Sequence, residues 1–147
     1  MAKPVTVAPP HVGSLVVLLR HCENKVRQRL QPLLDDAGLS PEHWRIMALL
    51  HEQPGLGAGA IAEGAVLPSA SVTRHVDKLV ERGMVVRRID PADKRRVVIG
   101  LSPRGQDKAE RLLAEERAVE DTIAAGLGAE RFRALAHDLG MLPHVLD

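Results

Sequence analysis

The pattern of residues 84–102 constrains the fold more than any other part of the sequence. Two segments, MVVRRID (84–90) and RVVIGLS (96–102), are rich in β-branched residues and follow the two-residue period of β-strands. The stretch between them, PADKR (91–95), has the proline and aspartate of a turn. We therefore predict one β-hairpin with a charged tip. A fold that holds this hairpin must otherwise be built from helices, because the remaining apolar positions have helical spacing.

Helix boundaries can be predicted from capping residues. Gly38 is expected to end the first helix, Ser40 to cap the second, Gly83 to end the fourth, and Ser102 to cap the fifth ahead of Pro103. On the second helix Trp44, Met47, Ala48 and Leu50 are expected to face inward, with Ile46 flanking. The predicted helices cover residues 12–34, 41–52, a short weak segment near 56–66, then 69–82, 103–125 and 129–142.

The glycines near residue 55 raise the question of nucleotide binding. Gly55 to Ala60 spell G-x-G-x-x-A, which in a dinucleotide-binding loop follows a strand and opens a helix. Here a helix and Pro54 precede the motif, and no strand is expected on either side. We therefore expect a short helix instead, with an apolar side formed by Leu56, Ile61, Ala62 and Val66.

This order of elements predicts a mainly α fold with one β-hairpin, a winged helix-turn-helix with flanking helices. Charge is distributed unevenly along it. Residues 68–105 hold nine Lys/Arg and four Asp/Glu, a balance of +5, so the rest of the chain carries −4. A basic surface confined to one helix and the hairpin suits a polyanion such as duplex DNA. A solvated basic surface without a partner is the alternative.

The helix at 69–82 is the predicted DNA-reading element, because the major groove of DNA is wide enough to admit a helix. Val72, Val76, Leu79 and Val80 are expected to face inward. Arg74 is the side chain able to bind guanine with two hydrogen bonds. The full predicted DNA-binding set is Ser69, Ala70, Ser71, Thr73, Arg74, Lys78, Arg88, Asp93, Lys94, Arg95 and Arg96.

The segment LVERGMVVRRIDPADKRRVVIGLSPRG resembles the corresponding part of MarR-type transcriptional regulators. The resemblance implies a homodimer that binds a palindromic operator and usually represses. The N-terminal sequence itself predicts a flexible arm at 1–11. The resemblance implies a single domain at 12–147, in which 38–103 form the winged lobe and 12–37 with 104–147 the dimerisation helices. In the family the wing arginine, here Arg95, enters the minor groove, and the nearby acid, here Asp93, orients basic residues. The family commonly begins its recognition helix with Ser-Pro, whereas this chain has Pro68-Ser69, so Ser69 is expected to cap the helix one residue later.

The N-terminal half, at SLVVLLRHCENKVRQRLQPLLDDAGLSPEHWRI, is similar to regulators of aromatic-acid catabolism such as homoprotocatechuate-operon repressors. This resemblance implies a phenolic or aromatic carboxylate effector, bound between the dimer helices and the winged lobe. Arg20 and Arg45 are the cations that could bind its carboxylate in bidentate fashion, and Trp44 precedes Arg45. Intramolecular ion pairs or solvent exposure of both arginines are the alternative, as is a regulator without a small ligand.

Other classes of function find less support in the sequence. Cys22 lies on the apolar stripe of the first helix and is expected to have a packing role, with a peroxide sensor as the alternative. The seven histidines form no known metal-ligand pattern, and we expect no metal or cofactor. No catalytic motif is present, so the chain is not expected to be an enzyme. Without a long apolar run or a signal peptide, no membrane partner and a cytoplasmic location are expected.

Overall fold

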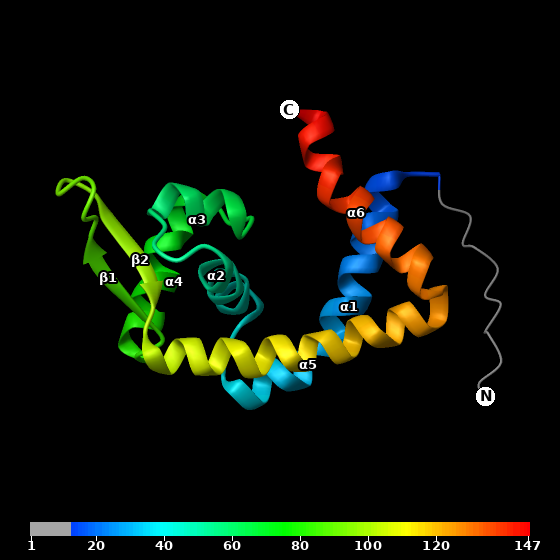
Figure 1. Cartoon of the computed structure of the whole chain (residues 1–147), viewed down its shortest axis with the longest axis horizontal. Helices are drawn as coiled ribbons and strands as arrows, with labels where there is room; N and C mark the ends of the chain where they lie inside the picture. The colour runs from blue at the N-terminus through cyan, green and yellow to red at the C-terminus, as the bar shows by residue number, and fades with distance from the viewer. Residues whose placement is uncertain (1–12) are drawn as a thin grey trace. The chain divides into compact units, whose positions relative to one another are not determined.

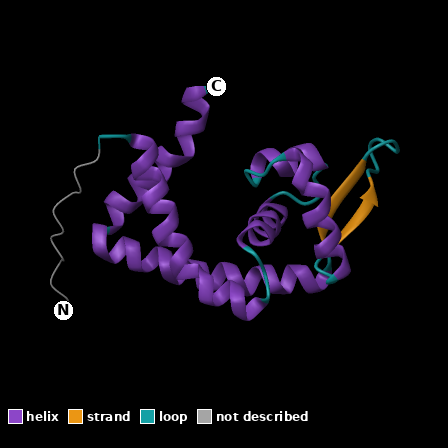
Figure 2. Ribbon diagram, turned by 180° about the vertical axis from the view of Figure 1, so that it is seen from behind, coloured by secondary structure: helices purple, strands orange, loops and turns teal. Residues whose placement is uncertain are grey.

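A computed structural model describes residues 13–147, so the expected arm at 1–11 and Val12 lie outside the described residues. Its elements divide between two compact units, a central unit at Leu30–Glu115 and a terminal unit that combines residues up to Arg29 with Glu116–Asp147. Figures 1 and 2 show the helices and the single hairpin. The elements are α1 (Leu15–Ala37), α2 (Pro41–Glu52), α3 (Ala58–Gly64), α4 (Ser69–Glu81), β1 (Val85–Ile89), β2 (Val97–Leu101), α5 (Pro103–Leu127) and α6 (Ala129–Leu146). The prediction of a mainly α fold with one hairpin is confirmed.

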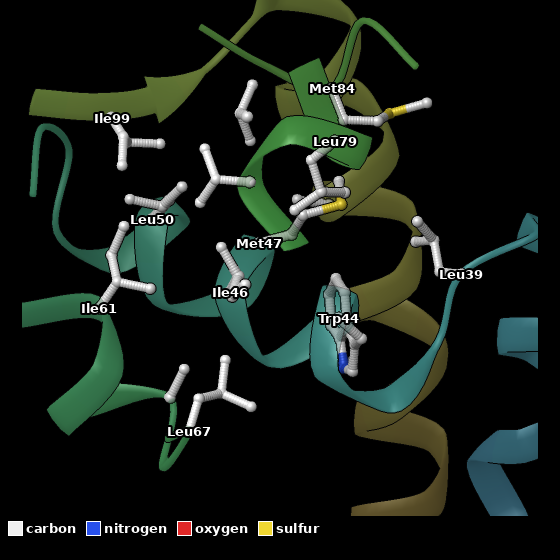
Figure 3. Close-up of a cluster of buried hydrophobic side chains, with 14 of the residues drawn as sticks. Leu39, Trp44, Ile46, Met47, Leu50, Ile61, Leu67, Leu79, Met84 and Ile99 are labelled. Atoms are coloured by element: carbon white, nitrogen blue, oxygen red, sulfur yellow. The ribbon is translucent and has the colours of Figure 1, made fainter. Parts of the chain in front are cut away.

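The core of the central unit is built around α2. Ile46, Met47 and Leu50 of α2 are completely or almost completely buried, and they meet Leu79 of α4 and Ile99 of β2 (Figure 3). The last turns of α1 and the first turns of α5 complete this core with the buried residues Leu34, Ala109 and Leu112. The unit is therefore longer than the lobe expected at 38–103, because both flanking helices contribute to its core.

Three helices end in Schellman motifs, in which one residue has a left-handed backbone. These residues are Gly38 after α1, Val66 after α3 and Gly83 after α4, with φ of 67°, 55° and 72°. In each motif the amide of this residue bonds a carbonyl three residues back, and the next amide bonds a carbonyl five residues back. The helix ends predicted at Gly38 and Gly83 are thus confirmed, whereas the motif around a valine was not foreseen.

Serine caps fix two helix starts as predicted. The Ser40 hydroxyl accepts a hydrogen bond from the His43 amide at 3.1 Å. The buried Ser102 hydroxyl accepts from the Gly105 amide at 2.9 Å and donates to the Gly83 carbonyl, and the Ser102 amide donates to the Met84 carbonyl at 3.0 Å. Ser102 therefore joins the start of α5 to the backbone between α4 and β1.

The hairpin is antiparallel, and its register runs from Val85 opposite Leu101 to Ile89 opposite Val97. The other edge of β2 is bridged by Leu56, which exchanges two backbone hydrogen bonds of 2.8 and 3.0 Å with Ile99. The glycines on both sides allow this approach, since Gly55 has φ of 82° and a Cβ on Gly57 would lie 3.3 Å from Arg96 Nη2. The G-x-G segment thus pairs with β2 at one residue. As predicted, a helix precedes it and a helix follows it.

Several predictions of which side chains face the core were wrong. The strands do not alternate, because β2 buries three successive residues, Val98, Ile99 and Gly100, whereas β1 buries Val85 alone. Leu56 belongs to the bridge and not to α3. On α2, Ile46 is fully buried and Ala48 is half-buried, and on α4, Val80 is exposed. After α3, Val66 is exposed, whereas its neighbours Ala65 and Leu67 are buried.

The described part of the terminal unit has an apolar surface and no buried residue. Every residue of α1 from Leu15 to Glu23 is exposed, and α6 contains no buried side chain. Leu15, Val16, Val145 and Leu146 are each more than half exposed. The described part of this unit therefore presents a large exposed apolar surface.

Candidate nucleic-acid interface

The outer face of α4 is polar, basic and accessible. Arg74 and Lys78 are exposed one turn apart, and neither has a hydrogen bond or an ion pair within residues 13–147. The inner face of the same helix carries Val72, Val76 and Leu79, all at most 1% exposed. The helical period thus separates the core contacts from two free cations, which can contact a phosphate or a guanine edge.

The N-terminus of α4 lacks a side-chain cap. Pro68 occupies the cap position, so the expectation that Ser69 caps this helix was wrong, and Ser69 is the first helical residue. The Ser71 hydroxyl does not point outward as a free donor, because it donates to the Pro68 carbonyl at 2.8 Å. The amides of Ser69 and Ala70 therefore have no side-chain acceptor, and an anion at this end could accept from them.

The tip of the hairpin is ordered by its two aspartates. Asp90 Oδ1 accepts from the Ala92 amide at 2.9 Å, and Asp93 Oδ1 accepts from the Arg95 amide at 3.0 Å. The Arg95 side chain, 94% exposed, extends from this turn with its Nε 3.4 Å from the same Asp93 oxygen. Asp93 thus fixes the backbone beneath Arg95 and leaves most of the guanidinium in solvent.

The remaining basic residues of the predicted set are distributed along the hairpin. Lys94 and Arg96 are exposed at the tip, and Arg88 is exposed on β1. The Arg88 guanidinium lies over Gly100, where an added Cβ would be 2.6 Å from Nη2. We refer to Arg74 and Lys78 of α4, Arg88 of β1 and Lys94–Arg96 of the tip together as the basic ridge.

Two other arginines that raise the local charge have structural partners. Arg87 forms an ion pair with Asp77 and so links β1 to α4. Arg82 donates to the carbonyls of Gly38 and Ala37, the latter at 3.2 Å, and so links the end of α4 to the end of α1. These partners could not be predicted from the sequence, because each pair joins separate elements. Both arginines stabilise the unit that presents the basic ridge.

A buried histidine also went unrecognised in the sequence. His43 is only 9% exposed, and neither ring nitrogen has a hydrogen-bond partner among the described residues. Its ring packs edge-to-face against His75 of α4, with centroids 5.2 Å apart. Burial lowers the pKa of His43, and burial followed by the nearby Arg74 lowers the pKa of His75. Both effects favour neutral rings beneath α4.

The three residues expected to bind an effector have different surroundings. Trp44 is 5% exposed and packs in the core of the central unit (Figure 3). Arg45 is half-buried, and its Nε donates to the Ala65 carbonyl at 2.8 Å, a hydrogen bond within the chain and not an ion pair. Arg20, in the terminal unit, is exposed and has no hydrogen bond or ion pair within the described chain.

Other candidate sites are less developed. Cys22 is exposed and unpaired, so within the described residues it has no buried packing position. Over residues 13–147, no three His, Cys, Asp or Glu side chains come together as a metal site. No helix in that range has the length and apolarity needed to cross a membrane.

The helices packed around α2, the polar and basic outer face of α4 and the β1–β2 hairpin together define a winged-helix protein of the kind that binds DNA. Comparison with known proteins agrees. Residues 39–97 match the MarR family model. The HTH-type transcriptional regulator FarR of Neisseria gonorrhoeae is 28% identical over 135 residues, 92% of each chain. The homoprotocatechuate degradative operon repressor of Escherichia coli is 25% identical over 84% of each. The solved structure of NadR in complex with 4-hydroxyphenylacetate has a TM-score of 0.82 at 27% identity, over 97% of each chain.

The winged part of the chain therefore matches the MarR family, and the relatives compared are named as transcriptional regulators. The family resemblance expected from the wing segment is confirmed by this match, which covers α2, α3, α4 and the hairpin up to the first residue of β2. MarR regulators bind DNA and act as dimers.

Proposed function

We propose that this chain forms a homodimer that represses transcription by binding a pseudo-palindromic operator. The basic ridge is the observation that carries the proposal, because it combines a polar helix face with an exposed cationic wing. Two copies of α4 would enter major grooves about one helical turn, ~10 bp, apart. An operator-binding protein of this kind would act in the cytoplasm, where a bacterial chromosome lies.

The terminal unit supports the homodimer. Its exposed apolar side chains on α1 and α6, among them Leu15, Leu139 and Val145, would be covered by the same surface of a second copy. Burying such side chains contributes roughly 25 cal/mol per Å² of apolar surface. Sedimentation analysis is expected to give a dimer.

The remaining residues of the predicted set have assigned roles in this proposal. Ser69 and Ala70 would present backbone amides to a phosphate, and Thr73 an exposed hydroxyl. Ser71, whose proton is used within the helix, would act as an acceptor only. Asp93 would hold Arg95 in the orientation that enters the minor groove, where narrow A·T-rich stretches attract an arginine.

Arg95→Ala tests the DNA-binding proposal. The probe is a duplex selected from a random pool with the wild-type protein, and binding is followed by fluorescence anisotropy at several salt concentrations. Each phosphate contact contributes about 0.9 to the salt slope, so losing one cation from each protomer is expected to reduce it by about 1.8 and to weaken binding several-fold or more. Arg111→Ala is the matched control, because Arg111 is an exposed arginine of the same unit outside the basic ridge. Equal binding by both variants would refute the assignment of the wing.

We further propose a small aromatic or phenolic acid as effector, which releases the protein from DNA by preferring a conformation that does not fit two adjacent grooves. The names of two relatives, one a homoprotocatechuate operon repressor and one a NadR structure with 4-hydroxyphenylacetate, support this class. Arg20 is the candidate for the carboxylate because its guanidinium is free. Trp44 could contribute only through movement of the core.

A thermal-shift screen with 4-hydroxyphenylacetate and related aromatic carboxylates tests the effector. We expect a shift with the wild-type protein that is lost in Arg20→Ala. A shift retained in Arg20→Ala and lost in Arg45→Ala would assign the carboxylate to Arg45 instead. Two results together would favour the thiol-sensing alternative. No aromatic acid would change the melting temperature of the wild-type protein, and Cys22→Ser would abolish its release from DNA by peroxide.

A further inference from the structure

The turn between α3 and α4 holds a valine in a backbone conformation that favours glycine. Val66 has φ of 55°, and among the described residues no other non-glycine residue has a positive φ. In this region the Cβ of an L-residue approaches the carbonyl oxygen, and a β-branched side chain is the least suited to it. Gly38 and Gly83 occupy the same position of the same motif. Val66 therefore destabilises a motif that elsewhere in this chain contains glycine.

The surrounding structure imposes this conformation on Val66. The Arg45 side chain donates to the Ala65 carbonyl at 2.8 Å, and the amide of the buried Leu67 bonds the Ala62 carbonyl at 2.9 Å. These bonds hold the backbone on both sides of Val66, which is how a strained residue persists in a folded protein. They are made by its neighbours, so the valine side chain is not needed for them.

The Val66 side chain also adds nothing to the core. It is 79% exposed, the same exposure as Leu146 at the end of the chain, while Ala65 and Leu67 beside it are 2% and 8% exposed. The backbone strain lowers the stability of the isolated chain, and a side chain that stays exposed buries too little apolar surface to offset it. Any favourable contribution of the Val66 side chain must therefore come from contact with another molecule.

The position of Val66 indicates the partner. It lies three residues before Ser69, the first residue of α4, and the N-terminal residues of a recognition helix lie closest to the base edges. We propose that the isopropyl group of Val66 packs against apolar atoms of the operator, a thymine 5-methyl group or the carbon atoms of a deoxyribose. This inference rests on the DNA-binding function proposed above and adds a contact residue to it.

The chemistry of Val66 restricts what the contact can do. An isopropyl group cannot bind phosphate or the polar edge of a base, whereas apolar contact with the thymine methyl is a recognised mode of reading in the major groove. A contact with the methyl group would select thymine at one position of each half-site. A contact with a sugar would raise affinity without selecting a base.

Val66→Gly separates stability from binding. Relief of the left-handed strain is expected to raise Tm by about 2–6 °C, while loss of the contact weakens binding to the selected duplex by roughly three- to tenfold. Gly83→Val is the matched control, because it places valine in the same motif where an added Cβ meets nothing closer than 4.0 Å, and it should lower Tm by a similar amount. Val66→Asn replaces the isopropyl group with a polar amide on a residue type that tolerates this backbone, and it should bind as weakly as Val66→Gly.

Deoxyuridine in place of single thymines identifies the apolar partner. If one substitution weakens wild-type binding and leaves Val66→Gly unaffected, the thymine methyl is the contact; if none does so, the contact is the sugar. Wild-type affinity in Val66→Gly or in Val66→Asn, or a Tm that does not rise in Val66→Gly, would overturn the inference and leave DNA binding intact. A wild-type protein that selects no duplex would instead overturn the proposed function itself.

Discussion

Among glycine-to-alanine substitutions in the described chain, Gly105→Ala is expected to destabilise the fold most. Gly105 lies in the first turn of α5, and an added Cβ would be 1.9 Å from the carbonyl oxygen of Met84 and 2.8 Å from its carbonyl carbon. Carbon atoms rarely approach a neighbour within about 3.0 Å, so the backbone of α5 or of residue 84 must move by about 1.1 Å.

This displacement acts on a cluster of hydrogen bonds. The Gly105 amide donates to Ser102 Oγ, the Ser102 amide donates to the Met84 carbonyl, and the Ser102 hydroxyl donates to the Gly83 carbonyl. Overpacking in a buried site costs about 1–3 kcal/mol, and each weakened hydrogen bond about 1 kcal/mol. We expect a loss of about 4–6 kcal/mol, a large part of the ~5–15 kcal/mol by which a folded domain is stable.

Urea unfolding at a fixed protein concentration measures this loss, because the stability of a dimer depends on concentration. Gly59→Ala is the control, since a Cβ at Gly59 meets nothing within 4 Å and alanine is the better helix former by about 0.5–1 kcal/mol. A Gly105→Ala protein with an unfolding midpoint equal to that of the wild type would refute the reasoning.

Two further predictions concern α4 and the residues beneath it. Arg74→Ala is expected to reduce discrimination against a changed base pair by about 1–3 kcal/mol, and an equal loss of affinity on every duplex would assign Arg74 to phosphate instead. Burial lowers the pKa of His43, so as the pH falls the unfolded chain binds a proton more readily than the folded chain does. The free energy of unfolding is therefore highest above about pH 6.5 and decreases as the pH falls below that value. His43→Leu, compared by urea unfolding between about pH 7 and about pH 5, should lose less stability than the wild type, and an unchanged pH dependence would contradict this.

The helices and their ends were predictable from local sequence. Gly38, Ser40, Gly83 and Ser102 act on backbone groups within a few residues of themselves, so capping rules located them correctly. The hairpin was predictable for the same reason, since its two strands and its turn are consecutive. The family resemblance added the expectation of a dimer with a wing that contacts DNA.

The burial of individual side chains and their hydrogen-bond and ion-pair partners were less predictable, because they depend on elements far apart in the sequence. Burial of three successive residues in β2 follows from cover supplied by other elements, including Leu56 across its far edge and Arg88 over Gly100. The left-handed Val66 escaped notice because a motif that usually contains glycine was not expected at a valine. The pairs that Arg87 and Arg82 form also depend on tertiary structure, so the charge count of residues 68–105 did not reveal that these two cations have partners within the chain.

The bridge between Leu56 and Ile99 has a consequence for solubility. A two-stranded ribbon has two unpaired borders, and either can recruit a strand from another molecule and begin aggregation. Here Leu56 occupies one border at its midpoint, and the other belongs to β1, which carries the exposed Arg87 and Arg88. Two such borders would repel each other by charge. The charge of Arg88 on the β1 border, together with the cover by Leu56, disfavours edge-to-edge pairing of the wing.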